Sequence, residues 1–102
     1  MQSQLDKSIK ILSAWGANAS QVEAILTSEF IQSELEARTK HIIAIQECLE
    51  LLFSEQKRRV EFMAKKNKSA LFPTKKPLEI MSSGSLHDLE EVHAKVRSMV
   101  CI

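Results

Sequence analysis

The chain has 102 residues, of which 44% are hydrophobic, and this length supports one compact domain with a modest core rather than two. Two glycines and two prolines are too few for the turns of a β protein, and no apolar run approaches the roughly 20 residues that cross a bilayer, so we expect an all-α protein without a membrane span. The first ten residues lack the order of a secretory signal, and Cys48 and Cys101 have no paired spacing, which predicts a cytoplasmic protein without a disulfide or a zinc site.

Basic residues gather in the middle of the chain, although the formal net charge is only +1. Residues 1–54 carry seven acidic and four basic side chains, residues 55–76 carry two acidic and eight basic ones, and the remainder carries four acidic and two basic ones. The basic stretch 57–76 is typical of a phosphate-binding surface, of a surface that docks on an acidic partner, or of a solvated face. Only Phe62 and Phe72 could stack on bases, and both are predicted core residues, which favours the solvated face over nucleic-acid binding.

The first half of the chain predicts two short helices followed by a long one. Leu5, Ile9 and Leu12 recur at helical spacing over about residues 4–15, until Gly16 can end the helix. Ser20 with Glu23 forms a capping box that begins a brief second helix. No Gly or Pro interrupts residues 29–53, which predicts a long spine helix whose buried stripe is Ile31, Leu35, Ile42, Ile45, Leu49 and Leu52. Four further apolar residues widen this stripe, as expected if the helix is packed by several neighbours or by a second copy of the chain in a homodimer: Ile43, Cys48, Leu51 and Phe53.

The second half predicts three more helices. Ser54 caps a helix that ends near Asn67, turns Val60 and Met63 inward and leaves Arg58, Arg59, Lys65 and Lys66 to solvent. In the loop that follows, Leu71 and Phe72 are expected to anchor on the core. Pro77 begins a helix to Ser83 with Leu78, Ile80 and Met81 on its core side, Gly84 ends it, and Ser85 with Asp88 caps the last helix. That helix places Leu86, Leu89, Val92, Val96 and Met99 on one side. The whole is a small bundle of about six helices around one long central helix.

Catalytic and metal-binding patterns are weak in this sequence. His87 with Glu91 and Glu90 with His93 are one turn apart, but neither pair has a third ligand nearby. His41 lies at the flank of the spine's stripe, as a surface or hydrogen-bonded histidine does, and the serines around Gly84 are explained by helix capping. Because no phosphate loop, nucleophile elbow or carboxylate dyad is present, we expect a protein that is not an enzyme and needs no cofactor.

The first two helices are spaced like the opening of a helix-turn-helix unit. The stretch that should then be the recognition helix, residues 27–36, carries three glutamates and no basic residue. Carboxylates facing a phosphate-lined groove are repelled, so this stretch predicts poor DNA reading.

Residues 49–99 resemble the toxin-binding domain of antitoxins of the Xre/MbcA/ParS type. The resemblance is carried, in order, by Leu51-Leu52-Phe53, Phe62-Met63, Asn67, Pro77-Leu78 with Ile80-Met81, Ser83-Gly84, and the amphipathic segment Leu86 to Met99. Residues 5–26, with the Trp15-Gly16 pair, are similar to the first two helices of the Xre-like domain in the same family. The connection from Leu26 to Ile42 is shorter than the family's recognition helix and linker together.

The resemblance implies a homodimeric antitoxin that covers the active site of a cognate RES or ADP-ribosyltransferase toxin. It divides the chain into a truncated Xre-like part with the spine (1–53) and a toxin-binding-like region (54–102), within one compact domain. Among the residues of the resemblance, Phe53, Pro77, Leu78 and Gly84 have structural roles, and the expected toxin-binding residues are Asn67, Lys75, Lys76, Glu79, Ser82, His93 and Arg97. The alternatives are a DNA-binding regulator of the helix-turn-helix type and an orphan helical dimer without a partner.

Overall fold

The computed structural model describes residues 4–26, 30–64 and 75–100, and these residues form six α-helices and no strand. The helices are α1 (Gln4–Ala14), α2 (Ala19–Ile25), α3 (Gln32–Leu52), α4 (Gln56–Ala64), α5 (Pro77–Met81) and α6 (Leu86–Val100). The prediction of a small all-α fold with about six helices is confirmed. Within the described residues, no helix is both long enough and apolar enough to cross a lipid bilayer.

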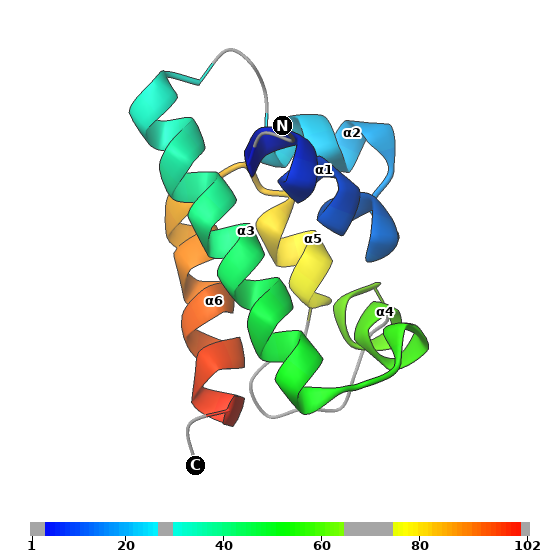
Figure 1. Ribbon diagram of the computed structural model, residues 1–102. Helices are drawn as coiled ribbons and strands as arrows, with labels where there is room; N and C mark the ends of the chain where they lie inside the picture. The colour runs from blue at the N-terminus through cyan, green and yellow to red at the C-terminus, as the bar shows by residue number, and fades with distance from the viewer. Residues whose placement is uncertain (1–3, 27–29, 65–74, 101–102) are drawn as a thin grey trace.

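The 21-residue helix α3 organises the fold (Figure 1). It packs against α1 on one side, and α6 lies beside it and runs in the same direction, while α5 contacts both α6 and α4. The buried apolar side chains of the described part are Leu12, Trp15, Ile25, Leu26, Ile42, Ile45, Leu49, Phe62, Met63, Leu78, Met81, Leu89, Val92 and Val96. They form one continuous core to which every helix contributes, as expected of a single small domain.

The ends of the first two helices are set by Gly16 and Asn18. Gly16 ends the first helix, as predicted, with a φ of +100° that glycine tolerates best. The second helix is capped by Asn18 and not by Ser20, which lies inside it. The Asn18 side chain accepts from the Gln21 N–H at 2.8 Å, and the Gln21 side chain accepts from the Asn18 N–H at 3.0 Å. The side chains of Asn and Gln offer hydrogen-bond acceptors, as those of Ser and Glu do. This capping box therefore pairs the N–H groups of Asn18 and Gln21, and it lies two residues before the predicted box of Ser20 and Glu23.

The spine's stripe is confirmed from Leu35 to Leu52 and is wrong at Ile31. Ile42, Ile45 and Leu49 are fully buried, and Leu35 and Leu52 pack against the core, but Ile31 is 69% exposed. Leu51, one of the residues expected to widen the stripe, is 76% exposed. Ile31 precedes the first turn in an extended conformation, so helical spacing does not apply to it. Residues 31 and 51 are roughly 30 Å apart along a helix axis, so they form no common apolar patch. The homodimer stays a prediction, which sedimentation can test.

Helix α4 differs from its prediction at its start and at Arg59. It begins at Gln56, so Glu55 and not Ser54 directly precedes it, and the Glu55 carbonyl accepts from the N–H groups of Arg58 and Arg59. Arg59 is not left to solvent, because its Nη1 donates to the carbonyls of Phe53 at 2.8 Å and Ser54 at 3.1 Å. The buried pair is Phe62 and Met63, whereas the predicted inward residue Val60 is only half-buried. The predictions for Lys65, Lys66, Asn67, Leu71 and Phe72 lie outside the described residues.

The turn between α5 and α6 follows the predicted capping closely. Pro77 occupies the first turn of α5, which ends at Met81 rather than at Ser83, and Gly84 takes a φ of +84°. The Ser85 hydroxyl accepts from the Asp88 N–H at 3.4 Å, and the Ser83 hydroxyl donates to the Asp88 carboxylate at 2.6 Å. The apolar side of α6 is as predicted: three of its residues, Leu89, Val92 and Val96, are buried, and Leu86 and Met99 pack against the core.

A buried arginine joins this turn to the rest of the molecule. Arg38 of α3 is 2% exposed. Its guanidinium donates to the carbonyl of Ile25 at 3.1 Å, to the carbonyl of Gly84 at 2.7 Å and to the Glu34 carboxylate at 2.9 Å. The ring of Phe30 lies over it, 3.8 Å from centroid to Cζ. One side chain therefore links the end of α2, the start of α3 and the α5–α6 turn.

Ser8 predicts a gain of stability on substitution. It is fully buried on α1, one turn before Leu12, and its hydroxyl has no hydrogen-bond partner among the described residues. Because an unpaired buried hydroxyl is destabilising, we expect Ser8→Ala to raise the free energy of unfolding by about 1 kcal/mol. Chemical denaturation measures this gain. The control, Ser13→Ala, changes an exposed serine on the same helix, and an equal gain in both variants would contradict the explanation.

Candidate interaction surface

The predicted toxin-binding residues fall into two groups on different helices. Lys75, Lys76 and Glu79 are exposed at the start of α5, whereas His93 and Arg97 belong to α6. Asn67 lies outside the described residues. Ser82 is half-buried, and its hydroxyl donates to the carbonyl of Leu78 at 2.7 Å, so it completes the end of α5. The structure therefore does not gather the predicted residues into one cluster.

The α6 group lines a shallow groove that α3 completes. This histidine groove has a volume of about 480 Å³ and is lined by His41, Glu90, His93, Ala94, Arg97 and Ser98. None of the predicted α5 residues lines it. Inside it the Nδ1 atoms of His41 and His93 are 2.7 Å apart, and the two rings meet edge to face at 5.0 Å between centroids. A nitrogen pair at this distance is hydrogen-bonded.

The surroundings of His93 disfavour its protonation. Burial lowers the pKa of His93 below its usual 6.5, and the nearby His41 and Arg97 lower it further. Burial acts because it removes water from the charged form, and the two neighbours act because they carry or acquire positive charge. The neutral form of His93 is therefore favoured near pH 7, and a hydrogen bond between the two Nδ1 atoms needs one ring to donate and the other to accept.

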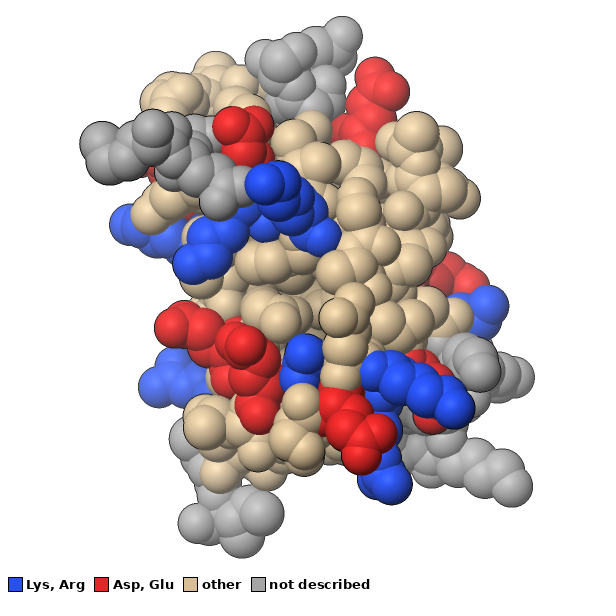
Figure 2. Space-filling model, turned by 45° about the vertical axis from the view of Figure 1, so that its right-hand side comes forward, with Lys and Arg blue, Asp and Glu red and all other residues tan. Residues whose placement is uncertain are grey.

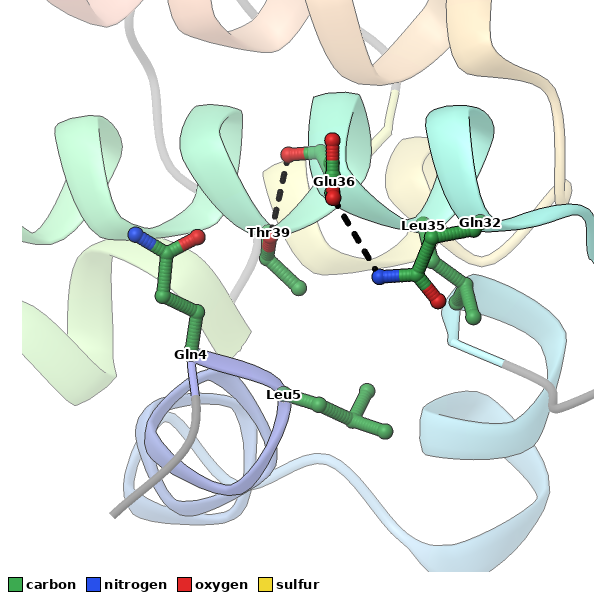
Figure 3. Close-up of a pocket in the computed structure, with 6 residues that line it drawn as sticks. All are labelled: Gln4, Leu5, Gln32, Leu35, Glu36 and Thr39. Carbon is green, nitrogen blue, oxygen red and sulfur yellow. Dashed lines mark hydrogen bonds between the residues drawn. The ribbon is translucent and has the colours of Figure 1, made fainter. Parts of the chain in front are cut away.

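A second groove separates α1 from α3 (Figure 3). It measures about 270 Å³ and is lined by Gln4, Leu5, Gln32, Leu35, Glu36 and Thr39. Three of its four polar residues are already paired, since the Gln32 amide donates to the Glu36 carboxylate at 3.3 Å and the Thr39 hydroxyl donates to the Glu36 carbonyl at 2.9 Å. These bonds lie within α3 itself. The groove thus offers few unsatisfied groups to a ligand.

Charges of both signs occur together on the surface. In the view of Figure 2, acidic and basic side chains surround a broad area of uncharged residues. Opposite charges also pair within α6, where the half-buried Lys95 lies 3.3 Å from the exposed Glu91. On this face the described residues do not form the single basic field that favours nucleic acid.

Residues of the one-turn pairs His87–Glu91 and Glu90–His93 make other contacts. Glu91 pairs with Lys95 rather than with His87, and His93 faces His41 rather than Glu90. Among the residues that the structure describes, no group of three or more His, Cys, Asp or Glu side chains is placed to hold a metal ion.

No protein-family model matches the chain, and no curated protein or solved structure matches it significantly. The resemblance to Xre/MbcA/ParS antitoxins therefore rests on the residues of the chain alone.

Sequence patterns missed the partner of His93. His41 and His93 are 52 residues apart, and each lies at the flank of an apolar stripe where a polar residue is unremarkable by itself. The only signal was that both stripes carry a histidine at their edge. The two histidines can be paired only when α3 and α6 are known to lie side by side. Helical periodicity shows which face of a helix is buried but not which helix packs on it.

Proposed function

We propose that this chain is an antitoxin-like protein that binds a cognate toxin of the RES or ADP-ribosyltransferase type and covers its active site. The observation that carries the proposal is the ordered series of short motifs over residues 49–99. Such a protein acts through a surface and needs no catalytic pocket. Shallow grooves and a helical scaffold are compatible with that mode of action.

The packing of the motif residues supports a division into scaffold and contact residues. The rings of Phe53 and Phe62 lie 5.6 Å apart, and Met63, Leu78 and Met81 are buried in the same core. These apolar motif positions are thus used internally and are not free to bind a partner, whereas Leu51 of the first motif is 76% exposed. The other residues left for binding are the exposed charges between the motifs, above all Lys75, Lys76 and Glu79.

The first experiment asks whether the partner exists. The reading frame next to this gene should encode a RES-like or ADP-ribosyltransferase-like protein. Its expression alone should stop bacterial growth, and co-expression of this chain should restore growth and give a complex that co-elutes in size-exclusion chromatography. Absence of such a neighbour, together with no rescue against related toxins, would refute the proposal.

The α5 edge provides a sharper prediction. We expect Lys75→Glu combined with Lys76→Glu to weaken toxin binding by about tenfold or more, because interface charges mainly set encounter and orientation. The free energy of unfolding should change by less than about 0.5 kcal/mol, since both side chains are exposed. Calorimetric titration with an inactive toxin variant measures the binding, and thermal unfolding measures the stability.

The matched control is Lys57→Glu with Arg58→Glu, which makes the same change of charge on the exposed part of α4. If both pairs weaken binding equally, net charge and not the α5 edge governs recognition. If neither does, the α5 edge is not a contact surface.

A further inference from the structure

The contact between His41 and His93 requires a particular protonation state. Two Nδ1 atoms at 2.7 Å form a hydrogen bond only when one carries a proton and the other offers its lone pair. When both rings are protonated, both Nδ1 atoms are donors and the same distance brings two positive rings together. The bond is therefore available to the neutral or singly protonated pair and is lost in the doubly protonated one.

The pair lies at a position where its loss has structural consequences. His41 belongs to α3 and His93 to α6, the two helices that run side by side through the molecule (Figure 1). His93 is flanked by Val92 and Val96, which are fully buried, so this part of α6 is held close to α3. A repulsion between the two rings would push against the packing of these valines.

The other charged groups around the pair do not cancel this repulsion. The charged residues that line the groove are both on α6: Arg97, which adds positive charge beside His93, and the exposed Glu90. On α3, Arg38 is directed to Glu34 and to the carbonyls of Ile25 and Gly84, and Lys40, which precedes His41 in the sequence, is exposed and does not line the groove. Helix α5, which also packs on α6, has Glu79 as its one charged residue, and that side chain is exposed and outside the groove.

We propose that the His41–His93 pair is a proton-sensitive joint that holds α6 against α3 near neutral pH and loosens the C-terminal part of α6 under mildly acidic conditions. The proposal is independent of the antitoxin function and can be tested without any toxin. It assigns His93 a positioning role within the fold: the protonation state of the two histidines controls how tightly α6 packs against α3.

The direction of the pH effect follows from the lowered pKa of His93. In the unfolded chain His93 titrates near its usual 6.5, and in the folded chain it titrates below that value. Above pH 6.5 both states are neutral and the contribution to stability is fully present. Between 6.5 and the lower folded pKa only the unfolded state takes up the proton, so the contribution is lost as the pH falls through this window. When the pKa of a group is one unit lower in the folded than in the unfolded state, complete acidification reduces the ratio of folded to unfolded protein by about tenfold.

The experiment compares the unfolding equilibrium of the wild type and of His93→Asn from about pH 7.5 down to about pH 5. Asparagine keeps a donor and an acceptor near the Nδ1 position but does not take up a proton. The control, His87→Asn, makes the same change on the exposed side of the same helix. We expect the wild type and His87→Asn to lose stability together on acidification, and His93→Asn to show a clearly flatter pH dependence.

Hydrogen exchange of backbone amides locates the effect in the intact wild-type chain. Amides of α6 from His93 onward should exchange at least several-fold faster at the acidic end of the range, after correction for intrinsic exchange, relative to amides of α1. All measurements are repeated with a strong metal chelator. The proposal is overturned if the stability curves of the wild type and His93→Asn run parallel, if α6 stays as protected as α1, or if the chelator abolishes the pH dependence.

Discussion

Replacing Arg38 by alanine should lower the free energy of unfolding by about 3 kcal/mol, a large share of the roughly 5–15 kcal/mol that holds a domain of this kind together. The guanidinium is 2% exposed and donates to the carbonyls of Ile25 and Gly84 and to Glu34. Truncation leaves both carbonyls without this donor and opens a cavity beside Phe30. Urea denaturation followed by circular dichroism measures the loss.

Two further variants separate the guanidinium bonds from the charge. Arg38→Lys keeps the charge but lacks the planar guanidinium that donates to two carbonyls in different directions. Its loss in free energy of unfolding should therefore be more than half of the loss in Arg38→Ala. Glu34→Gln removes only the carboxylate charge, and because Glu34 is 34% exposed its loss should be below about 1 kcal/mol. If Glu34→Gln costs as much as Arg38→Ala, the ion pair rather than the carbonyl bonds is the source of the stability.

Arg38 also marks the limit of what local patterns predict. Apolar spacing predicted the long helix and the buried side of α6, because a helix in a small domain shows its core face as a periodic stripe. The same spacing places position 38 on the buried stripe between Leu35 and Ile42, whereas the residue type argues against it, since charged side chains are seldom fully buried. Its burial depends on two carbonyls that are free only because α2 ends at Ile25 and the turn reverses at Gly84. Those acceptors are created by the tertiary fold.

The helix ends show which local signals were sufficient. Gly16 and Gly84 were predicted correctly, because few residues other than glycine adopt their positive φ. The Ser20 box was wrong because Asn18 and Gln21 offer the same chemistry two residues earlier, and Asn is at least as good a cap. A capping pattern is short, so neighbouring candidates compete and only the packing of α2 selects one. For the candidate surface, the local sequence pattern predicted that the charged residues of α5 are exposed. It could not predict the His41–His93 pair, because that pair depends on how α3 and α6 pack together.

The second large effect is expected for Gly84→Ala, which should lower the free energy of unfolding by about 2 kcal/mol. A φ of +84° is costly for any residue with a Cβ, by about 1–2 kcal/mol. The new Cβ would also lie 3.3 Å from the carbonyl oxygen of Ala24, a backbone atom that cannot rotate away. The turn must then shift, and the carbonyl of Gly84 would move relative to the Arg38 guanidinium that it accepts from. Thermal unfolding and urea denaturation measure this loss.

Because the strain and the arginine bond both act on residue 84, the two substitutions should not be additive. In an Arg38→Ala background the turn is no longer tied to α3, so it can relax around the new methyl group, and Gly84→Ala should cost about 1 kcal/mol less than in the wild type. Gly16→Ala is the matched control: it also has a positive φ, but its Cβ would meet only side chains, Ala64 Cβ at 3.5 Å and Val60 Cγ1 at 4.0 Å, and it shares no bond with Arg38. Its cost should be the same in both backgrounds. Additivity of Gly84→Ala with Arg38→Ala would show that the turn is held by the packing of α5 and α6 and that Arg38 only fills space beside it.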